Sequence, residues 1–426
     1  MASTYLTRTN SSAGSGTKFT ISTWLKRSSL STGIPRIMEF YHSTSYYISL
    51  RFRDDSSSAL QFYSESNGSG FGFTTNQVFR DVGAFYHIVL SVDTTLGTAD
   101  DRQKLYINGE QVTSFSSRTN PTSSVDLGYN TSSATNYIGR KFENSDYFDG
   151  LMAHFNYIDG TAYPASTFGE TNAASGIWTP LSAPSVTYGT NGVFLKFGSS
   201  GALGTDSSGN SNTFTVNGSG TQTQDAPSNV FATMNPLATS SYITLSNGNL
   251  TATGNTGAES GNSFCNYVPT TGKWYVEYKV TGISGNSAPT IGIRQEYPDG
   301  FQLTNTNTGM AGYATAYEAS IRRDGQRYQN NGTGSWGTSY TTGDIISIAL
   351  DCDNGAGYIA KNATYMNSGD PTSGASKTGA FVVWTQAQVN NFGQAFAVNN
   401  YNGSGTQANF GNGYFGTTAV ASGNAD

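Results

Sequence analysis

Short segments of alternating apolar and polar residues, separated by turns rich in glycine and asparagine, run along nearly the whole chain. In "KFTISTWLKR" the side chains of Phe19, Ile21 and Leu25 fall on one face, and "YHIVLSVD" and "KWYVEYKV" continue in the same way. A period of two predicts half-buried β-strands, and the Asn-Gly pair in "YING" is typical of a tight hairpin. We therefore predict an all-β chain made of antiparallel sandwiches of the jelly-roll type.

The predicted strands fall into two sets, and the alternating pattern is interrupted near Asp225. The stretch "DAPSNVFATMNPL" has two prolines and little periodicity, which indicates an ordered linker. Strands resume at "YITLSNGNLTAT", and the apolar run "GDIISIALD" is typical of a central strand in a second core. We predict two antiparallel β-sandwiches in tandem with almost no helix, at residues 1–200 and 236–426. Residues 201–235 form a turn-rich junction and linker between them.

Composition narrows the classes of function. Charged residues make up 12% of the chain and the formal net charge is -6, which gives no support to nucleic-acid binding. No apolar run reaches the roughly 18 residues that span a membrane, and the N-terminal residues lack the pattern of a secretory signal. The two cysteines, Cys265 and Cys352, are too few for a disulfide scaffold, and we expect Cys352 to be a small core residue. These features together favour synthesis in a reducing cytoplasm.

The loop "GALGTDSSGNSNTFTVNG" raises the question of a metal site. Its oxygen-bearing side chains alternate as calcium ligands do: Asp206, Ser208, Asn210 and Asn212. An EF-hand loop counted from Asp206 needs glycine at position 6 and an acidic residue at position 12, where this chain has Ser211 and Asn217. We expect a tight surface turn instead.

The first domain resembles the laminin G-like group of the concanavalin A-like lectin superfamily. The stretches that carry the resemblance are "KFTISTWLKRS", "FYHIVLSVD", "KLYINGEQV", "NYIGR" and "YFDGLMAHFNYIDG", in that order. The extension "TAYPASTFGETNAASGIWTPL", followed by "LGTDSSGNSNTFTVNG" and "DAPSNVFATMNPL", resembles structural proteins of tailed phages. By this resemblance the loop after Gly201 is a family junction. His154 departs from the pattern, at a place where an acidic residue is expected.

The second domain resembles a SPRY domain through "GKWYVEYKV", "TIGI", "GDIISIALDCDNG" and "ANFGNGYF". The resemblance implies another concanavalin-like sandwich, which recognises ligands through loops at one end. We expect the loops "SWGTSY" and "NGSGTQ" to carry this recognition.

Catalytic patterns are missing from the sequence. Glycosidases of this fold class place carboxylates at an E-x-D-x-x-E spacing, whereas "YFDGLMAHFNYIDG" offers only Asp149 and Asp159. We interpret His42, His87 and His154 as histidines of strands with satisfied hydrogen bonds. No H-E-x-x-H motif or phosphate loop occurs. We predict that the protein is not an enzyme and requires no cofactor.

Calcium is the metal that the candidate ligands would bind, because all of them are oxygen donors. The resemblance to laminin G-like domains implies a calcium site at a rim, and the acidic candidates are Asp54, Asp55, Asp93, Asp100 and Asp101. The simpler alternative is that these are solvated acids in turns.

Aromatic loop residues provide candidates for carbohydrate binding, since sugar rings stack on aromatic faces. The candidates for contact with a glycan or receptor are Tyr46, Tyr47, Trp336 and Tyr340. Tyr47 alternates with Ile48, so a core role is its alternative. Trp336 lies in a glycine-rich loop, which favours exposure.

We infer a bacteriophage virion surface protein, assembled in the host cytoplasm, that recognises host or surface glycans as a tail-fibre, receptor-binding or appendage component. The alternative is a structural capsid decoration or head-fibre protein without specific sugar binding, and a bacterial surface adhesin is a weaker third reading. Other virion proteins and a host polysaccharide or receptor are the expected partners. Virion appendages lie on symmetry axes, so we also expect a homo-oligomer or a symmetric array.

Overall fold

The computed structural model describes residues 4–30, 33–53, 58–198, 201–257, 260–285, 288–295, 311, 316–388, 393–412, 414–415 and 418–419. The chain divides into two compact units between Val230 and Phe231, called here the first and the second sandwich. Every helix within the described residues is a single 3₁₀ turn: Ala99–Asp101, Ala165–Thr167, Met366–Ser368 and Gly374–Ser376. None of these described helices is long and apolar enough to cross a membrane. The prediction of antiparallel all-β sandwiches is confirmed.

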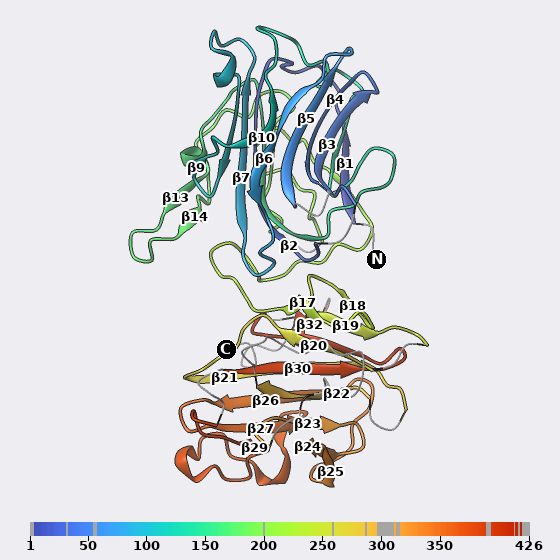
Figure 1. Cartoon of the computed structure of the whole chain (residues 1–426). Coiled ribbons are helices and arrows are strands. Elements are labelled where there is room, and N and C mark those ends of the chain that lie inside the picture. Colours follow the sequence, from blue (N-terminus) through green and yellow to red (C-terminus); the bar gives the residue numbers. More distant parts are fainter. Residues whose placement is uncertain are drawn as a thin grey trace. The chain divides into compact units, whose positions relative to one another are not determined.

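The first sandwich packs two antiparallel sheets around one core (Figure 1). The strands of its eight-stranded sheet are, in spatial order, β10 (Phe115–Thr119), β6 (Phe71–Val78), β5 (Ala59–Ser66), β4 (Tyr46–Phe52), β3 (Arg36–Ser43), β11 (Thr135–Ile138), β1 (Tyr5–Thr9) and β16 (Thr215–Asn217). Those of its six-stranded sheet are β15 (Val193–Leu195), β12 (Gly150–Asp159), β2 (Lys18–Arg27), β7 (Tyr86–Asp93), β8 (Gln103–Ile107) and β9 (Glu110–Gln111). Alternation along each strand sends one set of side chains into the core between the sheets.

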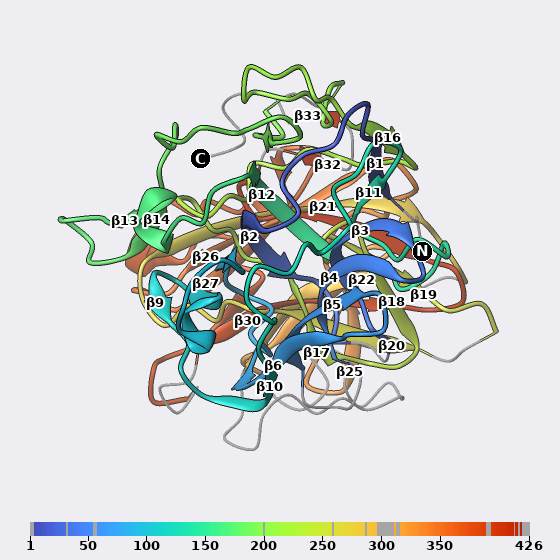
Figure 2. The ribbon, with the colours of Figure 1, turned by 90° about the horizontal axis from the view of Figure 1, so that it is seen from above.

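The outer face of the six-stranded sheet is covered by a later part of the same chain. The hairpin of β13 (Gly169–Thr171) and β14 (Trp178–Pro180) follows β12, and Figures 1 and 2 show it projecting beside the two main sheets. Phe168 is buried there in a small cluster with Val89 and Ile158, which point outward from β7 and β12. This face therefore has a second, smaller core of its own.

The loop after Gly201 is fastened to the first sandwich by hydrogen bonds. The Asp206 carboxylate accepts hydrogen bonds from the backbone N–H groups of Phe194 at 3.0 Å and Asn212 at 2.8 Å. β16 then pairs with β1 at the edge of the eight-stranded sheet. Residues 201–217 thus belong to the first sandwich rather than to a linker. The reason is a strand pairing between the two ends of the unit, which no local pattern in the sequence indicates.

The second sandwich has the same architecture. The strands of its seven-stranded sheet are β17 (Met234–Thr239), β20 (Gly261–Cys265), β30 (Gln394–Asn400), β22 (Thr290–Gln295), β23 (Ala319–Arg322), β24 (Gln326–Gln329) and β25 (Gly332–Ser335). Its eight-stranded sheet contains β18 (Ile243–Ser246), β19 (Thr251–Gly254), β31 (Gly405–Asn409), β21 (Lys273–Gly282), β26 (Ile345–Asp351), β27 (Ala356–Lys361) and β28 (Thr364–Tyr365), and β29 (Val382–Val383) also pairs with β27. A short ribbon joins β32 (Tyr414–Phe415) to β33 (Thr418–Ala419). Cys265 and Cys352 are buried free thiols of this core.

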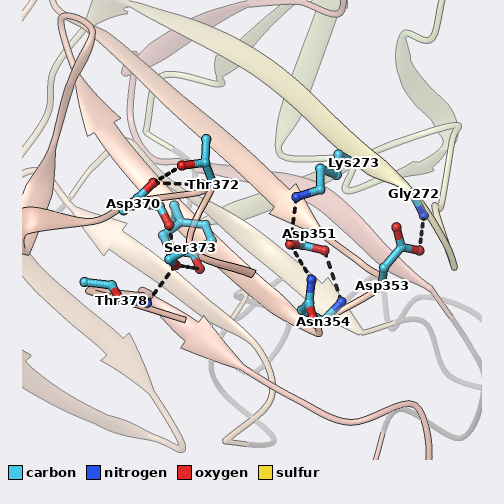
Figure 3. A network of polar contacts seen from close by, with 10 residues as sticks. Gly272, Lys273, Asp351, Asp353, Asn354, Asp370, Thr372, Ser373 and Thr378 are labelled. Atoms are coloured by element: carbon cyan, nitrogen blue, oxygen red, sulfur yellow. Dashed lines mark hydrogen bonds and ion pairs between the residues drawn. The ribbon is translucent and has the colours of Figure 1, made fainter. Parts of the chain in front are cut away.

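Aspartates fasten the turn between β26 and β27 (Figure 3). Asp351 accepts hydrogen bonds from Lys273 Nζ at 3.1 Å and from the side-chain nitrogen of Asn354 at 2.8 Å. Asp353 accepts one from the backbone N–H of Gly272 at 2.8 Å. These carboxylates take backbone and side-chain donors of the turn and of β21, so their role is to hold this end of the sheet together.

Candidate functional site

Three tyrosines from adjacent strands of the first sandwich point away from its core. Tyr41 lies on β3, Tyr47 on β4 and Tyr63 on β5, and each is half-buried. The neighbour of each tyrosine along its strand is fully buried: Phe40, Ile48 and Phe62. Because side chains alternate across a sheet, the tyrosines lie on the outer face of the eight-stranded sheet. We call the surface formed by Tyr41, Tyr47 and Tyr63 the tyrosine face.

The rings of the tyrosine face follow one another across the strands. The ring centroids of Tyr41 and Tyr47 are 6.4 Å apart, and those of Tyr47 and Tyr63 are 5.8 Å apart. Phe142 stacks on Tyr41 with a centroid distance of 4.0 Å and an angle of 11° between the planes. Contacts of this kind fix ring orientation. The result is a continuous aromatic row that crosses three strands.

Polar side chains flank this row. Arg51 Nε donates a hydrogen bond to Gln61 Oε1 at 2.7 Å, and Gln61 Nε2 donates to Thr74 Oγ1 at 3.1 Å. The Tyr63 hydroxyl donates to Glu65 Oε2 at 2.8 Å. A carboxylate, an amide and a guanidinium therefore lie beside apolar rings, which is the combination that ligand sites use for affinity and orientation.

Burial shifts the pKa values of several groups on the tyrosine face away from neutral pH or leaves them far above it. Burial, together with the hydrogen bond to Glu65, raises the pKa of Tyr63 to about 12. Burial and, to a smaller extent, the Glu39 carboxylate raise the pKa of Tyr47. Burial and the nearby Arg36 lower the pKa of Arg51 to about 10. At neutral pH the phenols of Tyr47 and Tyr63 keep their protons and Arg51 keeps its charge.

Tyr46 and Tyr47, which the sequence predicts as contact residues, have different surroundings in the structure. Tyr47 is the middle ring of the tyrosine face. Tyr46 packs over the turn at Gly128, where an added Cβ would lie 2.2 Å from a carbon of the tyrosine ring. Gly128 has φ of 64°, so glycine suits both the backbone and the close approach. Tyr46 thus holds a turn in place.

The aromatic candidates of the second sandwich pack inward. Trp336 is half-buried and meets the ring of Phe381 edge-on, at a centroid distance of 4.8 Å. Tyr340 is 3% exposed, and its hydroxyl lies 2.7 Å from the carbonyl oxygen of Pro289 and 3.0 Å from that of Ile321. Tyr340 is a core residue, because the loop "SWGTSY" turns its last side chain back into the sandwich.

A pocket of about 420 Å³ opens beside this loop. Its lining consists of Arg323, Asp324, Ser339, Tyr340, Thr341, Asp344 and Lys361. Lys361 Nζ lies 3.1 Å from Asp344 Oδ2 and 2.8 Å from the carbonyl oxygen of Ser339. Lys361 and Asp344 are thus paired with each other, while Arg323 donates to the carbonyl oxygen of Gly285 and Asp324 lies 3.2 Å from a guanidinium nitrogen of Arg322.

Asp93 of the predicted calcium ligands is used within its own turn and in an ion pair. Its Oδ1 accepts hydrogen bonds from the backbone N–H and hydroxyl of Thr95, and its Oδ2 lies 3.0 Å from Lys18 Nζ. Asp54 and Asp55 lie outside the described residues.

The other two predicted acidic ligands have separate partners. Asp100 accepts a hydrogen bond from Asn120 at 2.7 Å, and Asp101 lies 3.0 Å from Lys104 Nζ. Among the residues that the structure describes, no three histidine, cysteine or acidic side chains gather as a metal site would require. The described acids of this set are therefore not brought together.

Two histidines are engaged in hydrogen bonds within the first sandwich. The ring nitrogens of His87 lie 2.9 Å from the Ser22 hydroxyl and 2.9 Å from the indole N–H of Trp178, which donates to Nδ1. Burial lowers the pKa of His87 to about 3, so the ring is neutral. His42 Nδ1 lies 3.0 Å from the hydroxyl of Thr131.

Sequence reasoning missed Tyr41, Tyr63 and Phe142. The two tyrosines alternate with buried residues just as Tyr47 does, so strand periodicity was the signal that could have found them. Phe142 follows β11 in the chain and reaches Tyr41 only through the pairing of β11 with β3. No local pattern predicts that contact.

Residues 1–165 match the family model of a laminin G domain in the concanavalin A-like lectin/glucanases superfamily. Over these residues the first sandwich is similar to laminin G domains. The match covers the strands that carry the tyrosine face, and it agrees with the lectin-type resemblance of the first domain. A lectin-like domain of this superfamily supports ligand or carbohydrate binding in general terms.

Solved structures that are similar to the chain include two SPRY domains and a pentraxin. The SPRY domain of human HERC1 shares 17% identity at a TM-score of 0.30, covering 41% of this chain and 96% of that one. A human SPRY domain shares 15% identity at a TM-score of 0.29, and the match covers 39% of this chain and 94% of that one. The heptameric SAP-like pentraxin from Limulus polyphemus shares 17% identity at a TM-score of 0.28, and the match covers 38% of this chain and 71% of that one. No curated protein matches the chain.

Proposed function

We propose that the protein is a bacteriophage virion surface protein that binds host or surface polysaccharide through the tyrosine face, without catalysing a reaction. The observation that carries the binding proposal is the aromatic row of the half-buried Tyr41, Tyr47 and Tyr63 on the outer face of the eight-stranded sheet. The virion assignment rests on the resemblance of the extension and junction stretches to tailed-phage proteins. The expected location is the particle surface after assembly in the host cytoplasm.

The chemistry of the face suits a sugar ring. One side of a pyranose is a sheet of C–H groups that packs on an aromatic ring, while its hydroxyls need hydrogen-bond partners at the edge. The tyrosine rings supply the apolar surface for the C–H groups. Arg51, Gln61 and Glu65 supply hydrogen-bond partners for the hydroxyls. Because Arg51 and Glu65 carry opposite charges, the face favours a neutral glycan over a strongly charged one.

Calcium is not needed for this mode of binding, and we propose that binding persists after treatment with a chelator. The three rings and the flanking side chains would contact the sugar directly. Loss of binding in the chelator would instead point to a rim site that includes Asp54 or Asp55.

The test is binding of the purified chain to an array of bacterial surface polysaccharides. We expect Tyr47→Ala to weaken the wild-type signal about tenfold, equivalent to about 1.4 kcal/mol. Tyr47→Phe keeps the ring and should keep most of the signal. Tyr401→Ala removes a tyrosine that is 39% exposed in the second sandwich, and serves as the matched control.

Binding that is unchanged in Tyr47→Ala, or equally reduced in Tyr401→Ala, would contradict the tyrosine-face proposal. Absence of binding to any polysaccharide, combined with stable attachment to purified capsids, would favour the decoration protein instead.

A further inference from the structure

β25 (Gly332–Ser335) is an edge strand with a fully exposed set of residues. It ends the seven-stranded sheet of the second sandwich and pairs, among the described strands, only with β24 (Figure 1). All four of its residues are exposed. An edge strand of this kind presents backbone N–H and C=O groups that can pair with a strand of another chain.

β25 lacks the features by which edge strands usually avoid such pairing. Its sequence, Gly-Thr-Gly-Ser, has neither charge nor proline. At the other edge of the same sheet, β17 contains Pro236 and an irregular register. β10, an edge of the first sandwich, contains Arg118 and a register shift. Charge, proline and bulges all hinder edge-to-edge association, so β25 is the more open edge.

The hairpin keeps this edge in a strand conformation before any partner arrives. Asn330 and Asn331, between β24 and β25, have φ values of 48° and 54°, as a two-residue type I′ turn requires. The register from Gln329 opposite Gly332 to Gln326 opposite Ser335 contains no shift. A preformed strand loses less conformational freedom on binding.

We propose that β25 pairs with β25 of a second copy of this chain, antiparallel across a two-fold axis, and so joins two seven-stranded sheets. A two-fold axis places the same surface of both copies in contact and runs the two strands in opposite directions. A strand without charge meets itself without like-charge repulsion. Gly334 has no atom within 4 Å of the position of an added Cβ, so a second strand has room to approach.

This surface gives the homo-oligomer expected from the sequence a defined location, and it is independent of carbohydrate binding. Four residues supply few hydrogen bonds, so the association should be weak and concentration-dependent. Many copies held together on one particle would strengthen it.

Sedimentation of the full chain over a wide concentration range tests the proposal. We expect the mean mass to rise from 45.1 kDa toward twice that value. In the register that places Gly334 opposite Gly334 of the second copy, Gly334→Lys and Gly334→Glu should each weaken association at least tenfold, because equal charges then meet across the axis. An equimolar mixture of the two variants should restore it, because the charges are then opposite. Ala375→Lys adds a charge at another exposed site of the second sandwich and should behave as wild type.

Thermal midpoints of all three variants should stay at the wild-type value, since Gly334 has open space and a backbone that other residues adopt. A wild-type chain that stays monomeric at the highest concentration would overturn the proposal. So would a dimer that both Gly334 variants leave intact, because its contact would lie on another surface. A mixture that fails to restore association would show that β25 meets a different partner.

Discussion

The two outer faces of the first sandwich are both rich in aromatic residues, but their rings are packed to different depths. On the six-stranded sheet, Trp24, His87 and Trp178 stack in sequence, with centroid distances of 4.4 Å and 6.0 Å. On the eight-stranded sheet, Tyr47 and Tyr63 are only half-buried, and Phe142 stacks on the neighbouring Tyr41. The same alternation of residues therefore builds a second core on one face and an accessible aromatic surface on the other.

The difference arises from where the chain goes after β12. Its extension lies against the six-stranded sheet, and it comes so close that a Cβ added at Gly109 would lie 2.9 Å from the ring of Trp178. An outward aromatic residue is thus informative about function only when the segment that could cover it is known to lie elsewhere. This is why Tyr47 is a better candidate than an equally aromatic position on β7.

The largest expected effect is on the covered face. Phe168→Ala should lower the free energy of unfolding of the first sandwich by about 3–5 kcal/mol, because a ring that is 2% exposed leaves a cavity. Tyr63→Ala on the open face should cost about 1 kcal/mol or less. Denaturant unfolding of both variants measures the contrast. Equal losses would mean that the tyrosine face is packed as tightly as the covered one.

The buried, neutral ring of His87 should make the first sandwich less stable as the pH falls. Its pKa in the folded protein is about 3, below the ordinary value of 6.5, because burial disfavours the charged ring. The unfolded chain takes up this proton below about pH 6.5 and the folded chain does not, so stability present above pH 6.5 is lost on acidification. The loss is about 1.4 kcal/mol for each pH unit.

Unfolding measured between pH 6.5 and 5 tests this dependence before most carboxylates titrate. His87→Gln should reduce the slope without abolishing it, because burial also lowers the pKa of His154. A slope that is identical in wild type and variant would mean that His87 is not buried as described.

A smaller effect separates the two aromatic candidates that the sequence treated alike. Trp336→Ala should lower the free energy of unfolding of the second sandwich by about 1–3 kcal/mol, because its ring meets Phe381 and is half-buried. Its effect on polysaccharide binding should be small. If stability were unchanged while binding fell, recognition would lie in the loop "SWGTSY" and not on the tyrosine face.

The strands and the fold class could be predicted from the sequence because period-two alternation and turn residues are local signals. The alternation at Ile48 and Tyr47 was visible, as was the Asn-Gly hairpin after Ile107. The sequence predicts a junction where β16 lies, because the strand's partner, which includes Leu6, is near the other end of the unit. A pairing between strands so far apart in the sequence cannot be predicted from a short stretch of residues.

The candidate site was predicted only in part for the same reason. Tyr47 was identified from its loop-like surroundings, whereas its neighbours Tyr41 and Tyr63 join it only through the register of β3, β4 and β5. The prediction that Tyr340 is a contact residue is wrong, because a tyrosine in a polar, glycine-rich stretch has the same sequence pattern whether its ring points out or in. Its two carbonyl partners come from distant strands.

The most direct test of the tyrosine face is chemical labelling of tyrosine side chains, read out by mass spectrometry with and without a polysaccharide selected on the array. The account predicts that the polysaccharide protects Tyr41, Tyr47 and Tyr63 from labelling and leaves Tyr401 unchanged. Binding of that polysaccharide without protection of these three tyrosines would contradict it.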